Sequence, residues 1–231
     1  MERAFLYGDL LFETLLVQAD TIPHLALHYK RLSESAALLK MELCGLNEEK
    51  FCQEILQHAA LFRSQHPNAQ TLRARFVLYR DSEGFYLPNS NQSKYHISLF
   101  RFEPKPILQP IKVGVFRELS KAPGPLANLK SGNALIYVMA SIWAKENNFD
   151  DALILNTNHE IIEASYSNIF WLKNGLWHTP PLSSGCVNGI GRTLFMQKKP
   201  CQETSCTLQD LQSAEKCLLT NALHEPREFR A

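Results

Sequence analysis

Three prolines within eight residues, in the segment EPKPILQP at 103–110, divide the chain into two parts. Proline has no amide donor and a fixed φ, so this segment cannot continue a helix or the interior of a sheet. Such a segment suits a stiff connector between domains. We therefore predict a smaller N-terminal α/β domain over residues 1–102, a linker over 103–110 and a larger C-terminal domain over 111–231.

The N-terminal part contains both strand and helix patterns. Residues 12–18, 71–80 and 94–102 are rich in apolar and β-branched or aromatic side chains and predict strands. In residues 24–40 and 48–65 apolar side chains recur at spacings of three and four, which predicts two amphipathic helices.

The C-terminal part mixes the same two patterns. A strand is expected at 111–119, a helix opening near Lys130, and three further strands within 150–182, where the turn sequences NTNH and KNG separate apolar runs. A glycine-punctuated loop should open a helix within 187–199, and residues 215–223 should contain a last strand. The mixture predicts a two-domain α/β (α+β mixed) fold.

The charge and hydropathy of the chain exclude some partners. Its 24 Lys and Arg against 23 Asp and Glu give a formal net charge of +1 without clusters, so we expect no nucleic acid as a partner. We find no apolar run of the roughly 20 residues that a membrane span needs, and the start MERAFLYGD lacks the features of a signal peptide. We therefore expect a cytoplasmic protein with no membrane partner.

The cysteines are interpreted as reduced thiols because no CxxC pair and no export signal accompany them. Cys201, Cys206 and His224 were the best candidates for metal ligands, but their spacing matches no zinc module, so we expect no metal. The six cysteines are Cys44, Cys52, Cys186, Cys201, Cys206 and Cys217.

Lys130, in the segment LKSGNAL, precedes a long apolar stretch. A lysine in such surroundings either extends its charge to water or is kept partly dry for chemistry. An activated lysine most commonly forms a Schiff base with the aldehyde of pyridoxal phosphate. A structural lysine is the alternative, so other residues must support the chemical role.

Two other features could belong to the same chemistry. Glu163 follows two isoleucines in a strand pattern, and a carboxylate in apolar surroundings needs a partner such as a pyridinium nitrogen. The segment NGIGRT at 188–193 places glycines before a helix, where backbone amides suit a phosphate. Arg31, off the apolar stripe of its helix, could bind the same phosphate, or be a solvated helix residue.

In order along the chain, eight stretches resemble the class IV aminotransferase family, the fold-type IV pyridoxal-phosphate enzymes. They extend from Tyr7 to Leu223, nearly the whole chain. The stretches are YGDLLFET, HYKRL, LKSGNAL, DDALILN, IIEASYSNIF, LWHTPPL, GCVNGIGR and LLTNAL.

The resemblance implies roles for individual residues and a C-terminal domain that binds pyridoxal 5'-phosphate. Lys130 looks like the lysine that joins the cofactor aldehyde and later transfers protons, and Glu163 falls at the position that pairs with the pyridine nitrogen. The other cofactor positions implied are Arg31, Ile190 and Gly191 at the phosphate, Thr220, Asn221 and Ala222 in the last phosphate loop, and Tyr166 beside the cofactor strand.

Within the family, the spacing in KSGN and the stretches FET and GCVNGIGR favour 4-amino-4-deoxychorismate lyase. That enzyme eliminates pyruvate and leaves 4-aminobenzoate for folate synthesis. A D-amino-acid or branched-chain aminotransferase would use the same machinery and is the alternative. The resemblance also implies a homodimer that acts on a small-molecule substrate.

Several departures from the family concern the substrate pocket. The N-terminal strand that usually precedes YGD is expected to be missing, Leu10 replaces a glycine, and Phe85 stands where many relatives have an arginine. For the substrate carboxylates we suggest Arg75, Tyr86 and Arg101.

A remnant of the fold without catalysis, acting as a binding or structural dimer, is the alternative of another class. The presence of both Lys130 and Glu163 argues against it, because a scaffold does not need that pair. The expected lack of the first strand is its best support. Failure of the protein to bind pyridoxal phosphate would favour this alternative.

Overall fold

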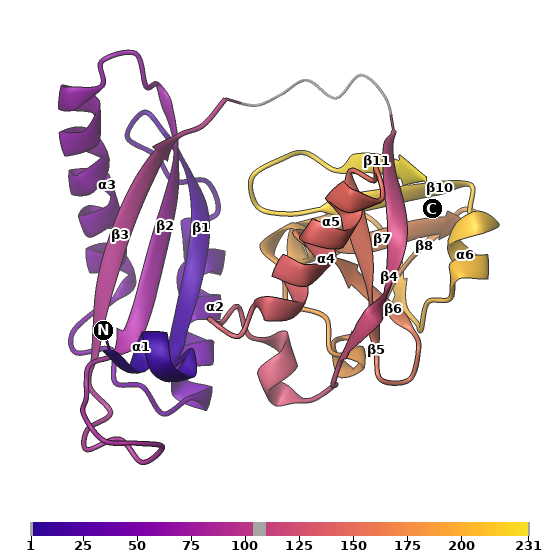
Figure 1. Ribbon diagram of the computed structural model, residues 1–231. Helices are drawn as coiled ribbons and strands as arrows, with labels where there is room; N and C mark the ends of the chain where they lie inside the picture. The colour runs from indigo at the N-terminus through magenta and orange to yellow at the C-terminus, as the bar shows by residue number, and fades with distance from the viewer. Residues whose placement is uncertain (1, 104–109, 231) are drawn as a thin grey trace. The chain divides into compact units, whose positions relative to one another are not determined.

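The computed structural model describes residues 2–103 and 110–230 (Figure 1). By their internal contacts, the described residues up to 103 and the segment Lys130–Asn133 form unit 1, and residues 110–129 and 134–230 form unit 2. The linker predicted at 103–110 stays a prediction, because residues 104–109 lie outside the described residues.

Unit 1 is a three-stranded antiparallel sheet with the order β1-β2-β3. Two helices cover one face: α2 contacts β1, and α3 contacts β2 and β3. The ring of Phe51 on α3 meets that of Phe76 on β2 edge-on at 4.7 Å between centroids, and both side chains are fully buried. The elements are α1 (Glu2–Tyr7), β1 (Leu10–Gln18), α2 (Leu25–Leu38), α3 (Glu48–Gln65), β2 (Thr71–Arg80) and β3 (Ser93–Arg101).

Alternation in the strands of unit 1 separates the two faces of the sheet. In β1 the buried residues alternate with half-buried ones, and Leu11, Leu15 and Val17 are on the buried side. Since successive side chains of a strand point to opposite faces, Phe12 of β1 and Arg75 of β2 lie on the face away from the helices. This second face is called the open face below.

Unit 2 contains an eight-stranded mixed sheet with the order β6-β5-β4-β11-β10-β7-β8-β9. Its strands are β4 (Ile111–Lys121), β5 (Asp151–Asn156), β6 (Ile161–Ala164), β7 (Asn168–Lys173), β8 (Leu176–Thr179), β9 (Cys201–Glu203), β10 (Lys216–Thr220) and β11 (Arg227–Arg230). Its helices are α4 (Leu135–Glu146), α5 (Ile190–Lys198) and α6 (Leu208–Gln212), with short 3₁₀ turns η1 (Pro125–Asn128) and η2 (Leu182–Ser184).

Apolar side chains fill both faces of the unit 2 sheet. Helix α4 packs on β4 and β5 (Figure 1), where its Ala140 and Ala144 meet Phe116 and Ile154. A separate cluster, which includes Trp171 and extends to α6, forms the other core. Strand β5 is buried at every position, and its inner residues 152–155 form a continuous apolar run instead of an alternating pattern.

The mixed α/β architecture predicted from the sequence is confirmed, with local differences. The helix predicted at 48–65 and the strand at 71–80 have the expected bounds. The helix expected to open near Lys130 begins only at Leu135. Neither α1 nor β11 was predicted. Within the described part of the chain, no helix is long and apolar enough to cross a membrane.

Candidate functional site

Lys130 lies beside β1 in a short extended segment and not in a helix. The Phe12 N–H donates to the Lys130 carbonyl at 2.9 Å, and the Gly132 N–H donates to the Leu10 carbonyl at 3.1 Å. A Cβ on Gly132 would lie 2.8 Å from Cγ of Leu10, so glycine at this position leaves room for the Leu10 side chain. The backbone of Lys130 is therefore fixed to the edge of the unit 1 sheet.

The ring of Phe12 contacts two cations on the open face. Nζ of Lys130 lies 4.5 Å from the ring centroid, and the Arg75 guanidinium carbon lies 4.3 Å from it. Burial, and then the neighbouring charge of Arg73, lower the pKa of Arg75. An aromatic ring flanked by a lysine and an arginine offers a flat anionic ligand both stacking and charge.

Arg31 is buried in unit 1, which differs from the solvated helix residue that the sequence left open. Its Nε and Nη2 donate to the two carboxylate oxygens of Glu13 at 2.7 and 2.5 Å. His28 Nδ1 lies 2.6 Å from the same carboxylate. Burial raises the pKa of Glu13, but the charge of Arg31 and the hydrogen bonds of both partners outweigh it and lower that pKa to about 2. The assignment of Arg31 to a phosphate stays a prediction.

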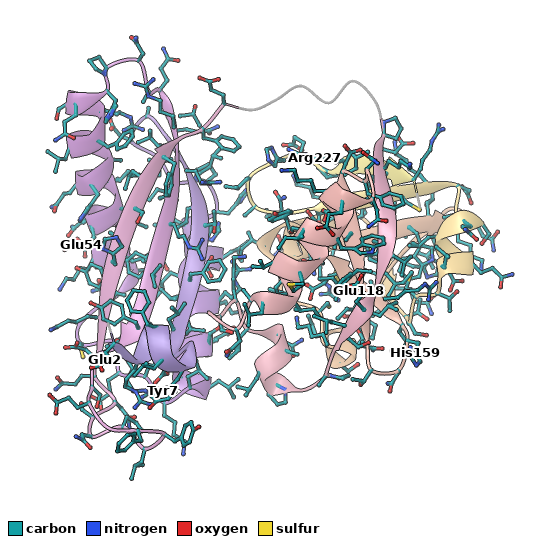
Figure 2. The ribbon with its side chains drawn as sticks, viewed as in Figure 1. Glu2, Tyr7, Glu54, Glu118, His159 and Arg227 are labelled. Atoms are coloured by element: carbon teal, nitrogen blue, oxygen red, sulfur yellow. The ribbon has the colours of Figure 1, made fainter. Side chains whose placement is uncertain are left out.

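The structure does not bring the three suggested substrate residues together. Arg75 is opposite Ser98 in the middle of the sheet, whereas Arg101 is opposite Leu72, three residues further along β2. At about 3.3 Å per residue these rows are roughly 10 Å apart. Tyr86 lies in the loop after β2, with its ring 5.4 Å from that of Tyr7, which Figure 2 labels. Of the three, Arg75 is the one placed beside Lys130 and Phe12.

Glu163 is buried in β6 of unit 2, with its side chain 3% exposed. Its Oε1 accepts hydrogen bonds from Lys121 Nζ and the Tyr137 hydroxyl, each at 2.8 Å. Its Oε2 accepts the Val187 N–H at 2.9 Å. The carboxylate is therefore ionically paired and held at both oxygens, as a buried carboxylate requires.

The first turn of α5 and the end of β10 form a compact cradle of polar groups. A Cβ on Gly191 would lie 2.6 Å from both the backbone N and O of Asn221, so the two backbones touch only because residue 191 is glycine. Thr220 is 3% exposed, and its Oγ1 has no hydrogen-bond partner among the described residues. The first N–H groups of a helix, here those of Ile190 and Gly191, lack intrahelical acceptors and favour an anion. These groups fit a phosphate.

Two asparagines stabilise this cradle. Asn168 Nδ2 donates to the Val187 carbonyl at 2.8 Å and so holds the loop before α5. Asn221 Oδ1 accepts the N–H groups of Leu223 and His224 at 2.9 and 3.1 Å, and thereby shapes the loop that contains Ala222. Both asparagine side chains have a structural role here.

Tyr166 lies in the turn between β6 and β7 and is 70% exposed. With Lys145, Asn148 and Asp150 it lines an open cavity of about 510 Å³ at the end of α4. In the described residues, no group of three or more His, Cys, Asp or Glu side chains could hold a metal ion.

Sequence reasoning missed several residues of these clusters. Glu13 and His28 were not considered, although a glutamate within an apolar strand was a usable signal in the sequence FETLLV. Lys121 and Tyr137 had no such signal, because nothing local distinguishes them from other strand-end lysines and helix tyrosines. Phe12 carries no charge and was interpreted only as a strand residue.

The comparisons with known proteins agree on one family. The family model described as "Amino-transferase class IV" matches residues 10–231. A putative branched-chain-amino-acid aminotransferase of Methanocaldococcus jannaschii is 26% identical over 97% of this chain and 78% of that protein. An aminodeoxychorismate lyase of Vibrio harveyi is 24% identical over 96% of this chain and 82% of its own.

Among solved structures, that of a putative 4-amino-4-deoxychorismate lyase from Legionella pneumophila is similar to this chain, with a TM-score of 0.85 and 26% identity. The match covers 98% of this chain and 84% of the other. The fold and the family model therefore agree over nearly the same residues.

Proposed function

Because the chain belongs to the class IV aminotransferase family and is thus a pyridoxal-phosphate-dependent enzyme, we propose that it is a 4-amino-4-deoxychorismate lyase. The proposed reaction releases pyruvate and leaves 4-aminobenzoate, which serves folate synthesis. The observation that carries this proposal is the likeness, at a TM-score of 0.85 and over 98% of the chain, to a putative lyase of that specificity.

The proposal assigns a role toward the cofactor to several residues described above. Bound pyridoxal phosphate supplies an electron sink conjugated to the amine of the substrate. Glu163 would accept a hydrogen bond from the ring nitrogen, while the Thr220 hydroxyl and the amides of Ile190 and Gly191 would donate to the phosphate. Thr220 Oγ1, which is buried without a hydrogen-bond partner among the described residues, is the feature that best supports this assignment.

Lys130 is proposed to take the proton from the substrate carbon that bears the amine. Its backbone is fixed by β1, so only the side chain has to move between the cofactor aldehyde and that carbon. Arg75 binds a substrate carboxylate, and Phe12, in contact with both cations, packs against the flat ring of the substrate.

An aminotransferase is the second candidate, favoured by the 26% identity to the Methanocaldococcus jannaschii protein over 97% of this chain. Lys130 would take the same proton but return it to a carbon of the cofactor, so that the amine passes to a keto acid. The two reactions differ in what leaves the substrate and not in which residues hold the cofactor.

The experiment that tests the proposal is a product assay on protein saturated with pyridoxal phosphate. We expect 4-amino-4-deoxychorismate to yield 4-aminobenzoate and pyruvate in equal amounts, and Lys130→Ala to abolish both. Lys50→Ala, which removes an exposed lysine in the first turn of α3, is the matched control and should keep full activity.

Two results would decide between the candidates. Cofactor binding without 4-aminobenzoate, together with transfer of the amine from a branched-chain or D-amino acid to 2-oxoglutarate, would replace the lyase by an aminotransferase. Equal activity of wild-type protein and Lys130→Ala would contradict both.

The proposal includes a homodimer, as the family resemblance implies, and a cytoplasmic location. Light scattering is expected to give about twice the chain mass of 26.3 kDa. A mass of one chain at micromolar concentration would contradict the dimer and leave the proposed reaction to be decided by the product assay.

A further inference from the structure

Lys121, the last residue of β4, ends in a closed cluster with Tyr137 and Glu163. Its Nζ lies 2.8 Å from Glu163 Oε1 and 2.5 Å from the Tyr137 hydroxyl oxygen. The same ammonium lies 5.1 Å from the centroid of the Tyr137 ring. Three contacts on one half-buried side chain indicate a fixed position, since a surface lysine normally keeps many rotamers.

The cluster joins three elements of unit 2. Lys121 comes from β4, Tyr137 from α4 and Glu163 from β6. The side chains of Lys121 and Glu163 are 13% and 3% exposed, so the ion pair is shielded from water and from salt. The interaction energy of Lys121 with Glu163 therefore differs from that of an exposed lysine–carboxylate pair. Lys173 and Asp210, 3.5 Å apart, form such an exposed pair.

Tyr137 contributes a neutral donor to the cluster. Burial, and then the negative charge of Glu163, raise the pKa of Tyr137 far above its usual range. Its hydroxyl therefore keeps its proton, donates to Glu163 Oε1 and accepts from Lys121. Both donors converge on one oxygen of the carboxylate.

The other oxygen of Glu163 is only partly used. Within the described residues Oε2 accepts the Val187 N–H, and a carboxylate oxygen can accept about two hydrogen bonds. The remaining lone pair of Oε2 is the one that a pyridine N–H could use. The positive charge of Lys121 beside Oε1 reduces the attraction of the carboxylate for a second cation, which here would be the protonated ring nitrogen.

We propose that Lys121 is a positioning residue that keeps the Glu163 carboxylate oriented and limits how strongly this carboxylate binds the ring nitrogen of the cofactor. The inference rests on the proposed assignment of Glu163 to that nitrogen. In this protein the ring nitrogen faces a carboxylate already neutralised by a lysine, and not an isolated negative charge.

Removal of the lysine charge has a direct consequence for binding. In Lys121→Met the buried carboxylate lacks its cation, and a protonated ring nitrogen becomes the group that neutralises it. The preference for a ligand with a ring nitrogen over one without it should then rise. Lys121→Arg retains the charge and should keep the preference of the wild-type protein.

The experiment compares two ligands by fluorescence titration: pyridoxal phosphate and its 1-deaza analogue, in which C–H replaces the ring nitrogen. The readout is the dissociation constant of the 1-deaza analogue divided by that of pyridoxal phosphate. We expect this ratio to rise about tenfold in Lys121→Met, in line with the loss of a charge-assisted contact. Lys173→Met removes the lysine of an exposed ion pair and is the matched control, with no change expected.

A second variant protects the test against poor folding of Lys121→Met. Tyr137→Phe removes one donor to the same oxygen without changing the charge, and it should raise the ratio about threefold. A clear rise in Lys121→Met, or in Tyr137→Phe where Lys121→Met does not fold, supports the proposal, provided that Lys121→Arg is unchanged.

Four outcomes would overturn the inference. An unchanged ratio in Lys121→Met and Tyr137→Phe, or the same rise in Lys173→Met, refutes the role of Lys121 and leaves the proposed function intact. Equal affinity of the wild-type protein for both ligands contradicts the assignment of Glu163 to the ring nitrogen. Failure of the wild-type protein to bind pyridoxal phosphate refutes the proposed function together with the inference.

Discussion

Glu13 and Arg31, which lie 18 positions apart in the sequence, form an ion pair with two hydrogen bonds in the interior of unit 1. Their side chains are 1% and 9% exposed. The pair joins β1 to α2, and His28 of the same helix contacts the same carboxylate. Such a pair is strongly destabilising to break from one side, because the remaining charge stays buried.

We predict that Glu13→Gln lowers the free energy of unfolding by about 3 kcal/mol at neutral pH. The pKa of Glu13 is lowered from 4.5 to about 2 in the folded protein. The stabilisation is therefore complete above pH 4.5 and is lost as the pH falls through about 2. Urea unfolding of both proteins between pH 7 and pH 2 measures it.

The matched control for that prediction is Glu34→Gln. Glu34 forms an exposed pair with Lys30 at 3.9 Å, and its loss should change stability by less than about 0.5 kcal/mol. A pH-independent difference between the wild-type protein and Glu13→Gln would contradict the assignment of the effect to the Glu13 charge.

Thr220→Val should separate stability from cofactor binding. The hydroxyl of Thr220 is buried without a partner in the described residues, so its replacement by a methyl should leave the stability of the free protein unchanged or slightly higher. The affinity for pyridoxal phosphate should fall about tenfold, because one donor to the phosphate is lost. Thermal unfolding and a titration give the two values.

Thr179→Val is the matched control for Thr220→Val. Thr179 is also fully buried at a strand end, but its hydroxyl donates to the Ile169 carbonyl at 2.8 Å. This variant should lose about 1 kcal/mol of stability and keep the cofactor affinity. The reverse pattern in the two variants would contradict the assignment of Thr220 to the phosphate site.

If the proposed function holds, Arg75→Met should raise the KM for 4-amino-4-deoxychorismate about tenfold to a hundredfold, since the proposed charge-assisted contact to a carboxylate is lost. Steady-state kinetics measures this, with little change expected in kcat. Arg101→Met, three residues away in register on the neighbouring strand, should leave KM unchanged. Equal effects of the two substitutions would show a general role of positive charge in place of a contact by Arg75.

The reactivity of each cysteine toward a thiol reagent should decrease as its burial increases. Cys44 is exposed and should react first with an aromatic disulfide reagent, in a phase that Cys44→Ser removes. Burial raises the pKa of Cys186 and Cys217 to about 11, so these thiols should react only after unfolding. Rapid labelling of Cys186 in the native protein, read by mass spectrometry, would contradict its burial.

The parts of the fold that were predictable from sequence depend on local signals. Helix α3 has an N-cap, Asn47, whose side chain accepts the Lys50 N–H, followed by acidic residues in the first turn. These signals and the apolar spacing lie within the helix itself. Its bounds were therefore predicted correctly.

The parts that were missed depend on contacts between distant segments. Lys130 was placed at a helix start, but its pairing with Phe12 of β1 holds it in an extended segment. Arg31 could not be recognised as buried from its helix alone, because Glu13, its partner, lies on a strand. The pairing of Glu163 with Lys121 joins residues 42 positions apart, and no periodicity contains that information.

The four residues Lys130–Asn133 belong to unit 1, although the chain on both sides of them belongs to unit 2. The polypeptide therefore passes between the units three times, and one cut within residues 104–109 cannot divide the protein into two self-sufficient fragments. The C-terminal fragment would retain a piece of the N-terminal sheet, and the N-terminal fragment would expose the edge of β1 at Leu10 and Phe12. The two fragments should therefore function only when combined, because Lys130 then comes from the C-terminal fragment and β1 from the N-terminal one.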